Sequence, residues 1–73
     1  MVTYRLIFEE TEEYEAAAYS YGILAVGEDH RIRVIRDITD DKERLLGFID
    51  ELNELSLDPI HLDEAVEDFL CNL

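Results

Sequence analysis

Residues 31–55, RIRVIRDITDDKERLLGFIDELNEL, contain the change of pattern that decides the fold. Arg31–Arg36 alternate basic and β-branched residues, which is typical of a β-strand. From Leu45 to Leu55, apolar residues recur every three to four positions and predict one apolar face of an α-helix. The chain is therefore expected to have a strand half followed by a helical half.

Two further strands are expected before residue 31. Residues 3–9 alternate, so that Tyr4, Leu6 and Phe8 share one side. The acidic run Glu9–Glu15 is interpreted as a solvated turn, and the residues of 16–26 are rich in tyrosine and aliphatic side chains. A turn-like cluster, Gly-Glu-Asp-His at 27–30, closes that segment. Three strands with short connections predict an antiparallel meander.

Two helices are expected in the second half. Asp40 and Glu43 have the spacing of a capping box, with Thr39 as an alternative cap, and Gly47 predicts close packing inside this first helix. Asp58–Pro59 suits the start of a second helix, whose apolar stripe continues to the C-terminus. The expected fold is α+β in the order β-β-β-α-α, a single domain of residues 1–73 with both helices on one sheet face. The predicted core comprises Tyr4, Leu6, Phe8, Ile23, Ile32, Val34, Leu45, Phe48, Ile49, Leu52, Leu62, Val66, Phe69 and Leu70.

The charge balance excludes several classes of partner. The 73 residues include 19 acids and 6 bases, a formal net charge of −13. Such a chain is poorly suited to bind the phosphates of nucleic acid or an anionic membrane surface. No apolar run is long enough for a signal peptide or a membrane span, and one unpaired cysteine favours the cytoplasm. Because 48% of the residues are hydrophobic, a folded core is expected.

Little in the sequence suggests catalysis or a cofactor. His30 falls in the expected turn, His61 lies near a helix start, and Cys71 is near the end of the second helix. No phosphate loop, nucleophile motif or calcium loop is present. We therefore predict no catalytic residue, no metal, no cofactor and no enzymatic activity.

The two halves of the chain differ in charge. Residues 5–44 contain eleven acids and all six bases, whereas residues 45–73 contain eight acids and no base. The simplest interpretation of this acidic helical surface is solubility. The alternative is an inhibitor or regulator that engages a basic surface, such as that of a nucleic-acid-binding protein. The residues expected to bind such a partner are Glu51, Glu54, Asp63 and Glu67.

Self-association through the sheet is the leading functional hypothesis. Neither of the strands expected at 16–26 and 31–36 has a fully polar face, and leftover apolar surface on a small sheet often marks an interface. A domain of this size also gains stability from a second subunit, so a homodimer is expected. Arg31 and Arg33, joined by Arg5, could form a basic patch, but we interpret these arginines as partners of neighbouring carboxylates. The residues expected at the self-association surface are Ile7, Tyr19, Tyr21, Arg31, Arg33 and Ile35.

Four short segments carry a resemblance to a known family. They are Tyr21-Gly22-Ile23, Asp37-Ile38-Thr39-Asp40-Asp41-Lys42, Leu57-Asp58-Pro59-Ile60-His61-Leu62 and Glu67-Asp68-Phe69-Leu70. In their order and spacing the chain resembles a family of short uncharacterised proteins from anaerobic Gram-positive bacteria, classed as a domain of unknown function. The resemblance implies a cytosolic bacterial protein and brings no activity, ligand or catalytic residue.

Overall fold

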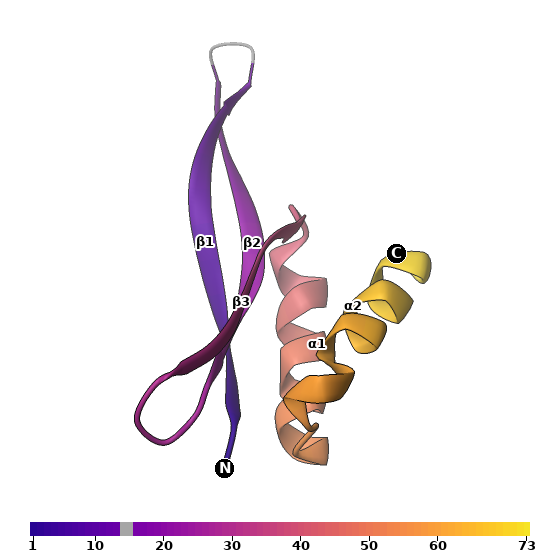
Figure 1. The fold of residues 1–73 in the computed structure, drawn as a ribbon. Helices are drawn as coiled ribbons and strands as arrows, with labels where there is room; N and C mark the ends of the chain where they lie inside the picture. The colour runs from indigo at the N-terminus through magenta and orange to yellow at the C-terminus, as the bar shows by residue number, and fades with distance from the viewer. Residues whose placement is uncertain (14–15) are drawn as a thin grey trace.

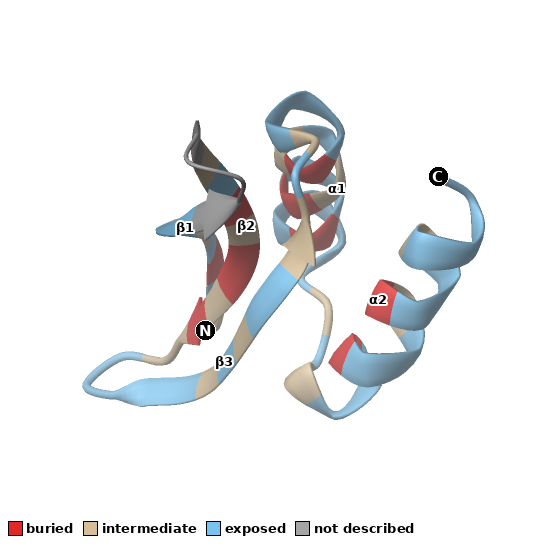
Figure 2. Ribbon diagram, turned by 90° about the horizontal axis from the view of Figure 1, so that it is seen from above, coloured by how far each residue is buried: buried red, intermediate tan, exposed pale blue. Residues whose placement is uncertain are grey.

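The computed structural model describes residues 1–13 and 16–73, in the expected order of elements (Figure 1). Strands β1 (Thr3–Glu13), β2 (Ala16–Val26) and β3 (Arg31–Thr39) form an antiparallel sheet in the order β1-β2-β3. Helix α1 (Lys42–Leu55), a 3-10 turn η1 (Pro59–His61) and helix α2 (Leu62–Cys71) follow. Both helices lie on the same side of the sheet, which confirms the predicted α+β architecture (Figure 2).

The hairpin of β1 and β2 is longer than the sequence suggested. β1 continues to Glu13, and every residue from Thr3 to Glu13 has a partner in β2. The interpretation of the acidic run as a turn is therefore wrong for Glu9–Glu13, and its remaining positions, 14 and 15, lie outside the described residues. Backbone pairing of Glu9–Glu13 with Ala16–Ser20 extends the strand through these residues.

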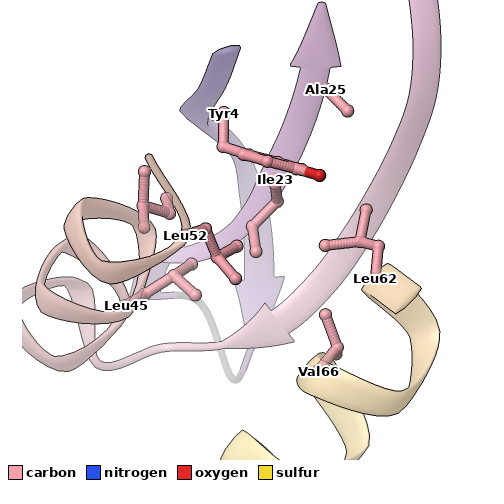
Figure 3. Close-up of a cluster of buried hydrophobic side chains, with 8 residues drawn as sticks. Tyr4, Ile23, Ala25, Leu45, Leu52, Leu62 and Val66 are labelled. Carbon is pink, nitrogen blue, oxygen red and sulfur yellow. The ribbon is translucent and has the colours of Figure 1, made fainter. Parts of the chain in front are cut away.

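The core lies between one end of the sheet and the two helices, and its side chains point toward one another (Figure 3). Leu6, Phe48 and Phe69 are partly buried at its border, and the Phe48 and Phe69 rings stack with centroids 4.6 Å apart. Most of the predicted core is thereby confirmed, and Ala25 is an addition to it. The buried apolar residues are Tyr4, Ile23, Ala25, Leu45, Ile49, Leu52, Leu62 and Val66.

Four predicted core residues, Phe8, Ile32, Val34 and Leu70, are instead exposed. In β3 the prediction chose the wrong face, because Ile23 pairs with Ile35 and Leu24 with Val34. Ile35 therefore packs against the core, and Val34 lies on the opposite face. Phe8 lies beyond the start of α1, and Leu70 lies in the last turn of α2.

An irregularity in β3 turns the chain from the sheet toward α1. Tyr21 pairs with Thr39 and Ile23 with Ile35, so three residues of β3 lie opposite Gly22 alone. Asp37 at their centre has a left-handed backbone, with φ 54°, and its carboxylate accepts a hydrogen bond from the Ser20 hydroxyl. A Cβ at Gly22 would collide with the Ile35 carbonyl oxygen. The close approach of the two strands at this bulge therefore requires glycine.

Two details of the helix starts correct the sequence analysis. The N-cap of α1 is Asp41, rather than Asp40 or Thr39, and its carboxylate accepts from the Arg44 backbone N–H at 3.2 Å. Asp58 is an N-cap before Pro59, as predicted. The element that it caps is the 3-10 turn η1, however, and α2 starts only at Leu62.

The expected close packing at Gly47 is wrong. Nothing lies within 4 Å of the position that a Cβ would take there, because this side of α1 faces solvent. Gly47 therefore carries the usual entropic disadvantage of glycine in a helix without a packing reason.

Candidate interaction surfaces

Tyr4 connects β1 to α1 through its backbone groups and to the segment after α1 through its phenol. Its N–H donates to Asn53 Oδ1 at 2.8 Å, and Asn53 Nδ2 donates to its carbonyl oxygen at 2.9 Å. The phenol donates to the Leu57 carbonyl oxygen at 2.7 Å, and burial, with a smaller contribution from Asp58, raises the pKa of Tyr4. The amide of Asn53 thus occupies the place of a neighbouring strand at this point of the β1 edge.

Beyond Tyr4 the edge of β1 is open. Backbone groups in an antiparallel strand point alternately toward and away from the neighbouring strand. Because the groups of Tyr4 point away from β2, those of Leu6 and Phe8 do so too. Within the described part of the chain, no hydrogen bond reaches these outward groups of Leu6 and Phe8. Unpaired edge groups of this kind are a template for pairing with another strand.

An aromatic patch, made of Leu6, Phe8, Tyr19 and Tyr21, continues the helix side of the sheet past the start of α1. In Figure 1 the hairpin extends beyond this end of α1. Phe8 is 67% exposed and Tyr19 is 48% exposed, and their rings meet edge to face with centroids 6.1 Å apart. The four residues line a shallow depression, and Lys42 at the start of α1 lines it too. Phe8 and Tyr19 are the exposed part of the patch, whereas Leu6 and Tyr21 are partly buried against the core.

The opposite side of the sheet, the open sheet face, is covered by neither helix (Figure 2). It has a shallow hollow of about 260 Å³ beside Gly22, lined by the aliphatic residues Ile7, Leu24 and Val34. The polar and charged residues around this hollow are Glu9, Ser20, Arg31, Arg36 and Asp37. An apolar strip with both signs of charge at its margins is suited to contact another protein surface.

The predicted self-association residues do not form one surface. Ile7 and Arg31 lie at the hollow of the open sheet face, while Tyr19 and Tyr21 belong to the aromatic patch. Arg33 and Ile35 lie on the helix side of β3, opposite Ala25 and Ile23. Arg31 and Arg33 therefore do not form the basic patch that the sequence suggested.

Arg33 reaches from the sheet to α2. Its two terminal nitrogens donate to the two carboxylate oxygens of Asp63 at 2.8 Å each. This hydrogen bonding lowers the pKa of Asp63 and raises that of Arg33. The interpretation of the arginines as partners of carboxylates is confirmed for Arg33. Arg33 lies on the side of β3 that faces the helices, and its long side chain keeps the charge at the surface.

The predicted partner-binding acids are spread over both helices. Glu51 and Glu54 are exposed on α1, and Glu67 is exposed on α2 beside Glu64, Asp68 and Cys71. Asp63 differs from the other three because it is engaged by Arg33. The helical surface is thus less uniformly negative than the sequence suggested, since one cation of the strand half reaches it.

The remaining candidates for chemistry are dispersed. His30 is exposed in the β2–β3 loop, where its carbonyl oxygen accepts from the Gly27 N–H at 2.9 Å. His61 ends η1, and Cys71 is exposed at the end of α2. Among the described residues, no three His, Cys, Asp or Glu side chains lie together as a metal-binding group would require. In the same residues, no helix is long and apolar enough to cross a membrane.

Comparison with known proteins identifies the family. A family model matches residues 1–72, nearly the full chain. The chain belongs to DUF6514, a family of unknown function. No curated protein and no solved structure matches the chain at a significant level. Of the segments that carried the resemblance, the one at Gly22 and the one at Asp37 meet at the β3 bulge, and Asp58–Pro59 starts η1. In this DUF6514 chain those segments therefore shape the fold.

Proposed function

We propose that the protein is a non-enzymatic interaction module that associates with a second copy of itself through its sheet. One observation carries the proposal: Phe8 is 67% exposed although it is on the same face of β1 as Tyr4, which is 2% exposed. A large apolar side chain left uncovered at the border of a core, beside a second exposed ring at Tyr19, is typical of an interface.

Two further features support self-association. The open sheet face presents Ile7, Leu24 and Val34, and no part of the described chain covers them fully. A chain of 73 residues also buries a small core, and association is one of the ways in which such domains gain stability. The net charge of −13 opposes association, so we expect the dimer to tighten as salt is added.

Sedimentation equilibrium over a micromolar concentration range, at about 0.15 M salt, tests the proposal. We expect a mass near twice the 8.5 kDa of one chain. Phe8→Lys should shift the protein toward the monomer, because it places a charge in the aromatic patch. Leu55→Lys is the matched control, since Leu55 is 74% exposed on α1 and should tolerate the change. A wild-type protein that stays monomeric throughout would show the proposal to be wrong.

A second candidate function is an acidic inhibitor or regulator of a basic protein, such as one that binds nucleic acid. The supporting observation is the cluster of Glu64, Glu67 and Asp68 on the outer side of α2, with Glu51 and Glu54 exposed on α1. A surface of this kind attracts basic partners over distances comparable with the Debye length.

Neutralising the acids tests this second function. Glu51→Gln, Glu54→Gln and Glu67→Gln together should abolish capture of a basic protein such as lysozyme, used as a probe at low salt. The control carries three neutralisations outside the helices, Glu10→Gln, Glu28→Gln and Asp29→Asn, so its net charge equals that of the test variant. It should still bind, because its helical acids are intact. Equal loss in both variants would mean that capture reflects overall charge alone.

We also propose a cytoplasmic location, since one unpaired cysteine suits a reducing compartment.

A further inference from the structure

We infer that the second copy pairs antiparallel with the open edge of β1, about a two-fold axis at Ile7, so that two three-stranded sheets become one sheet of six strands. The inference rests on the proposed self-association and names the surface that mediates it. It is carried by the free backbone groups of Leu6 and Phe8, by the side chains of residues 5–9, and by Asn53 at the end of the open edge.

The backbone geometry limits the choice of register. The outward N–H and C=O groups of β1 belong to even-numbered residues, because those of Tyr4 point to Asn53. Two copies of β1 can therefore pair only where even residues meet even residues, which places the two-fold axis at one residue of the strand. An axis at any of residues 10–13 would place carboxylates of the two copies opposite each other, so the residues left to compare are Leu6, Ile7, Phe8 and Glu9.

The side chains select Ile7 from these registers. With the axis at Ile7, Arg5 lies opposite Glu9 of the second copy and Leu6 lies opposite Phe8, and symmetry gives each pair twice. An axis at Phe8 would place Ile7 opposite Glu9, and an axis at Glu9 would place two carboxylates opposite each other. An axis at Leu6 would require the backbone groups of Tyr4, which Asn53 already occupies.

Asn53 sets the length of the pairing. In the Ile7 register, Tyr4 falls opposite Glu10 of the second copy, but its N–H and C=O are bound by the Asn53 amide. The ladder between copies therefore covers Arg5–Glu9 and ends at Asn53 on both sides. A short ladder with a defined end produces a closed dimer, whereas an edge free along its full length could pair in several registers.

The pairing covers the surface that the monomer leaves open. Leu6 of each copy would pack beside the exposed Phe8 of the other on the helix side of the sheet. On the open sheet face the two Ile7 side chains would meet at the axis. Because Ile7 lines the hollow of each copy, the two hollows would adjoin across the dimer.

Proline substitution on the wild-type background tests the backbone contact. Phe8→Pro removes an outward N–H that the dimer uses and the monomer does not, and proline is tolerated at such edge positions. Because it also removes the ring, Phe8→Ala, which keeps the N–H, is measured beside it, and Phe8→Pro should weaken the dimer more than Phe8→Ala does. We expect Phe8→Pro to be a folded monomer by sedimentation and circular dichroism. The matched control is Glu10→Pro, whose N–H also points outward but lies beyond the ladder, and it should remain dimeric.

A charge exchange tests the register without relying on proline. R5E and E9R should each weaken self-association at least roughly tenfold, because each places like charges opposite each other at both ends of the ladder. An equimolar mixture of R5E and E9R should form a heterodimer, since both ladder ends then regain opposite charges. The same mixture remaining monomeric would overturn the Ile7 register.

The outcomes separate this inference from the proposed function. A monomeric wild type removes both. If the wild type is dimeric, remains so as Phe8→Pro, and becomes monomeric as Val34→Lys, then self-association stands and the contact lies on the open sheet face. Loss of the dimer in Phe8→Pro with its retention in Glu10→Pro and Val34→Lys supports the β1 edge.

Discussion

Tyr4 and Phe8 lie four residues apart on the same face of β1, and their surroundings are opposite. Tyr4 is buried, and its phenol, N–H and C=O all have partners in the helical half. Phe8 is mostly exposed, and its outward backbone groups have no partner in the described chain. The start of the strand is thus held by the helical half, whereas at Phe8 the outward backbone groups and the side chain face solvent.

The difference follows from the lengths of the elements. The 14 residues of α1 span about 21 Å, whereas the 11 residues of β1 span about 36 Å. A helix of this length cannot cover a hairpin of that length, so the aromatic patch continues beyond it. In a chain this short, added strand length extends the surface without enlarging the core.

The largest contrast should come from truncating one buried and one exposed side chain on the same face of the hairpin. Ile23→Ala should lower the free energy of unfolding by about 2–5 kcal/mol, because Ile23 is fully buried and its loss leaves a cavity. Phe8→Ala should change the stability of the monomer by less than about 0.5 kcal/mol. Urea denaturation, extrapolated to low protein concentration, measures both. Equal losses would mean that Phe8 belongs to the core.

Substitution of Gly22 and of Gly47 by alanine should change the stability of the protein in opposite directions. Gly22→Ala should cost about 1–3 kcal/mol, because a Cβ collides with backbone atoms of Ile35 and Arg36 at the bulge. Gly47→Ala should stabilise the protein by up to about 1 kcal/mol, since a Cβ there meets open space in a helix. Thermal unfolding of the two variants checks the signs. A tolerated Gly22→Ala would show that the bulge can open.

Removing the Asn53 amide should weaken the attachment of the start of β1 to α1. Asn53→Ala leaves the N–H and C=O of Tyr4 without their partners and should cost about 1–2 kcal/mol. Asn72→Ala is the control, because the Asn72 amide bonds only the exposed Asp68 carbonyl oxygen near the chain end. Hydrogen exchange at the Tyr4 amide should accelerate in Asn53→Ala and stay unchanged in Asn72→Ala.

The phenol of Tyr4 should make stability depend on alkaline pH. Its pKa is raised in the folded state, so this contribution is complete below about pH 10, the ordinary pKa of tyrosine, and is lost as pH rises through the folded value. Tyr4→Phe should cost about 1 kcal/mol at neutral pH and weaken the alkaline dependence. Urea denaturation of both proteins at pH 8 and pH 10.5 measures this pH dependence of the free energy of unfolding. An unchanged alkaline slope in Tyr4→Phe would assign the dependence to another group.

The smallest effect is expected at the Arg33–Asp63 ion pair. Because Arg33 lowers the pKa of Asp63, the pair stabilises the fold above the ordinary pKa of 3.8 and is lost as pH falls through the lowered value. Asp63→Asn should therefore reduce the loss of stability in acid, and high salt should reduce the difference between variant and wild type. A double-mutant cycle with Arg33→Gln isolates the contribution of the pair.

Periodicity predicted the elements, their order and most of the core, because Tyr4, Ile23 and the helix stripes follow regular spacings. It failed in β3, where the alternation is the same whichever face is buried, and the pairing of Ile23 with Ile35 decides. It also placed Phe8 in the core, because a strand pattern contains no information on how far along the strand the covering helix extends. Asn53 was missed for a similar reason, since a polar residue beside a helix stripe looks like any solvated side chain.

The bonds of Tyr4 also affect the order in which the chain can fold. Its partners Asn53 and Leu57 lie 49 and 53 residues later in the sequence, whereas the hairpin that contains it forms from neighbouring segments. Hairpins form within about 1–10 μs, and contacts between distant residues carry a larger entropic cost of loop closure. The β1 edge is therefore exposed along its full length until α1 docks. During that interval, the mutual repulsion of chains carrying a net charge of −13 protects the hairpin against premature strand pairing.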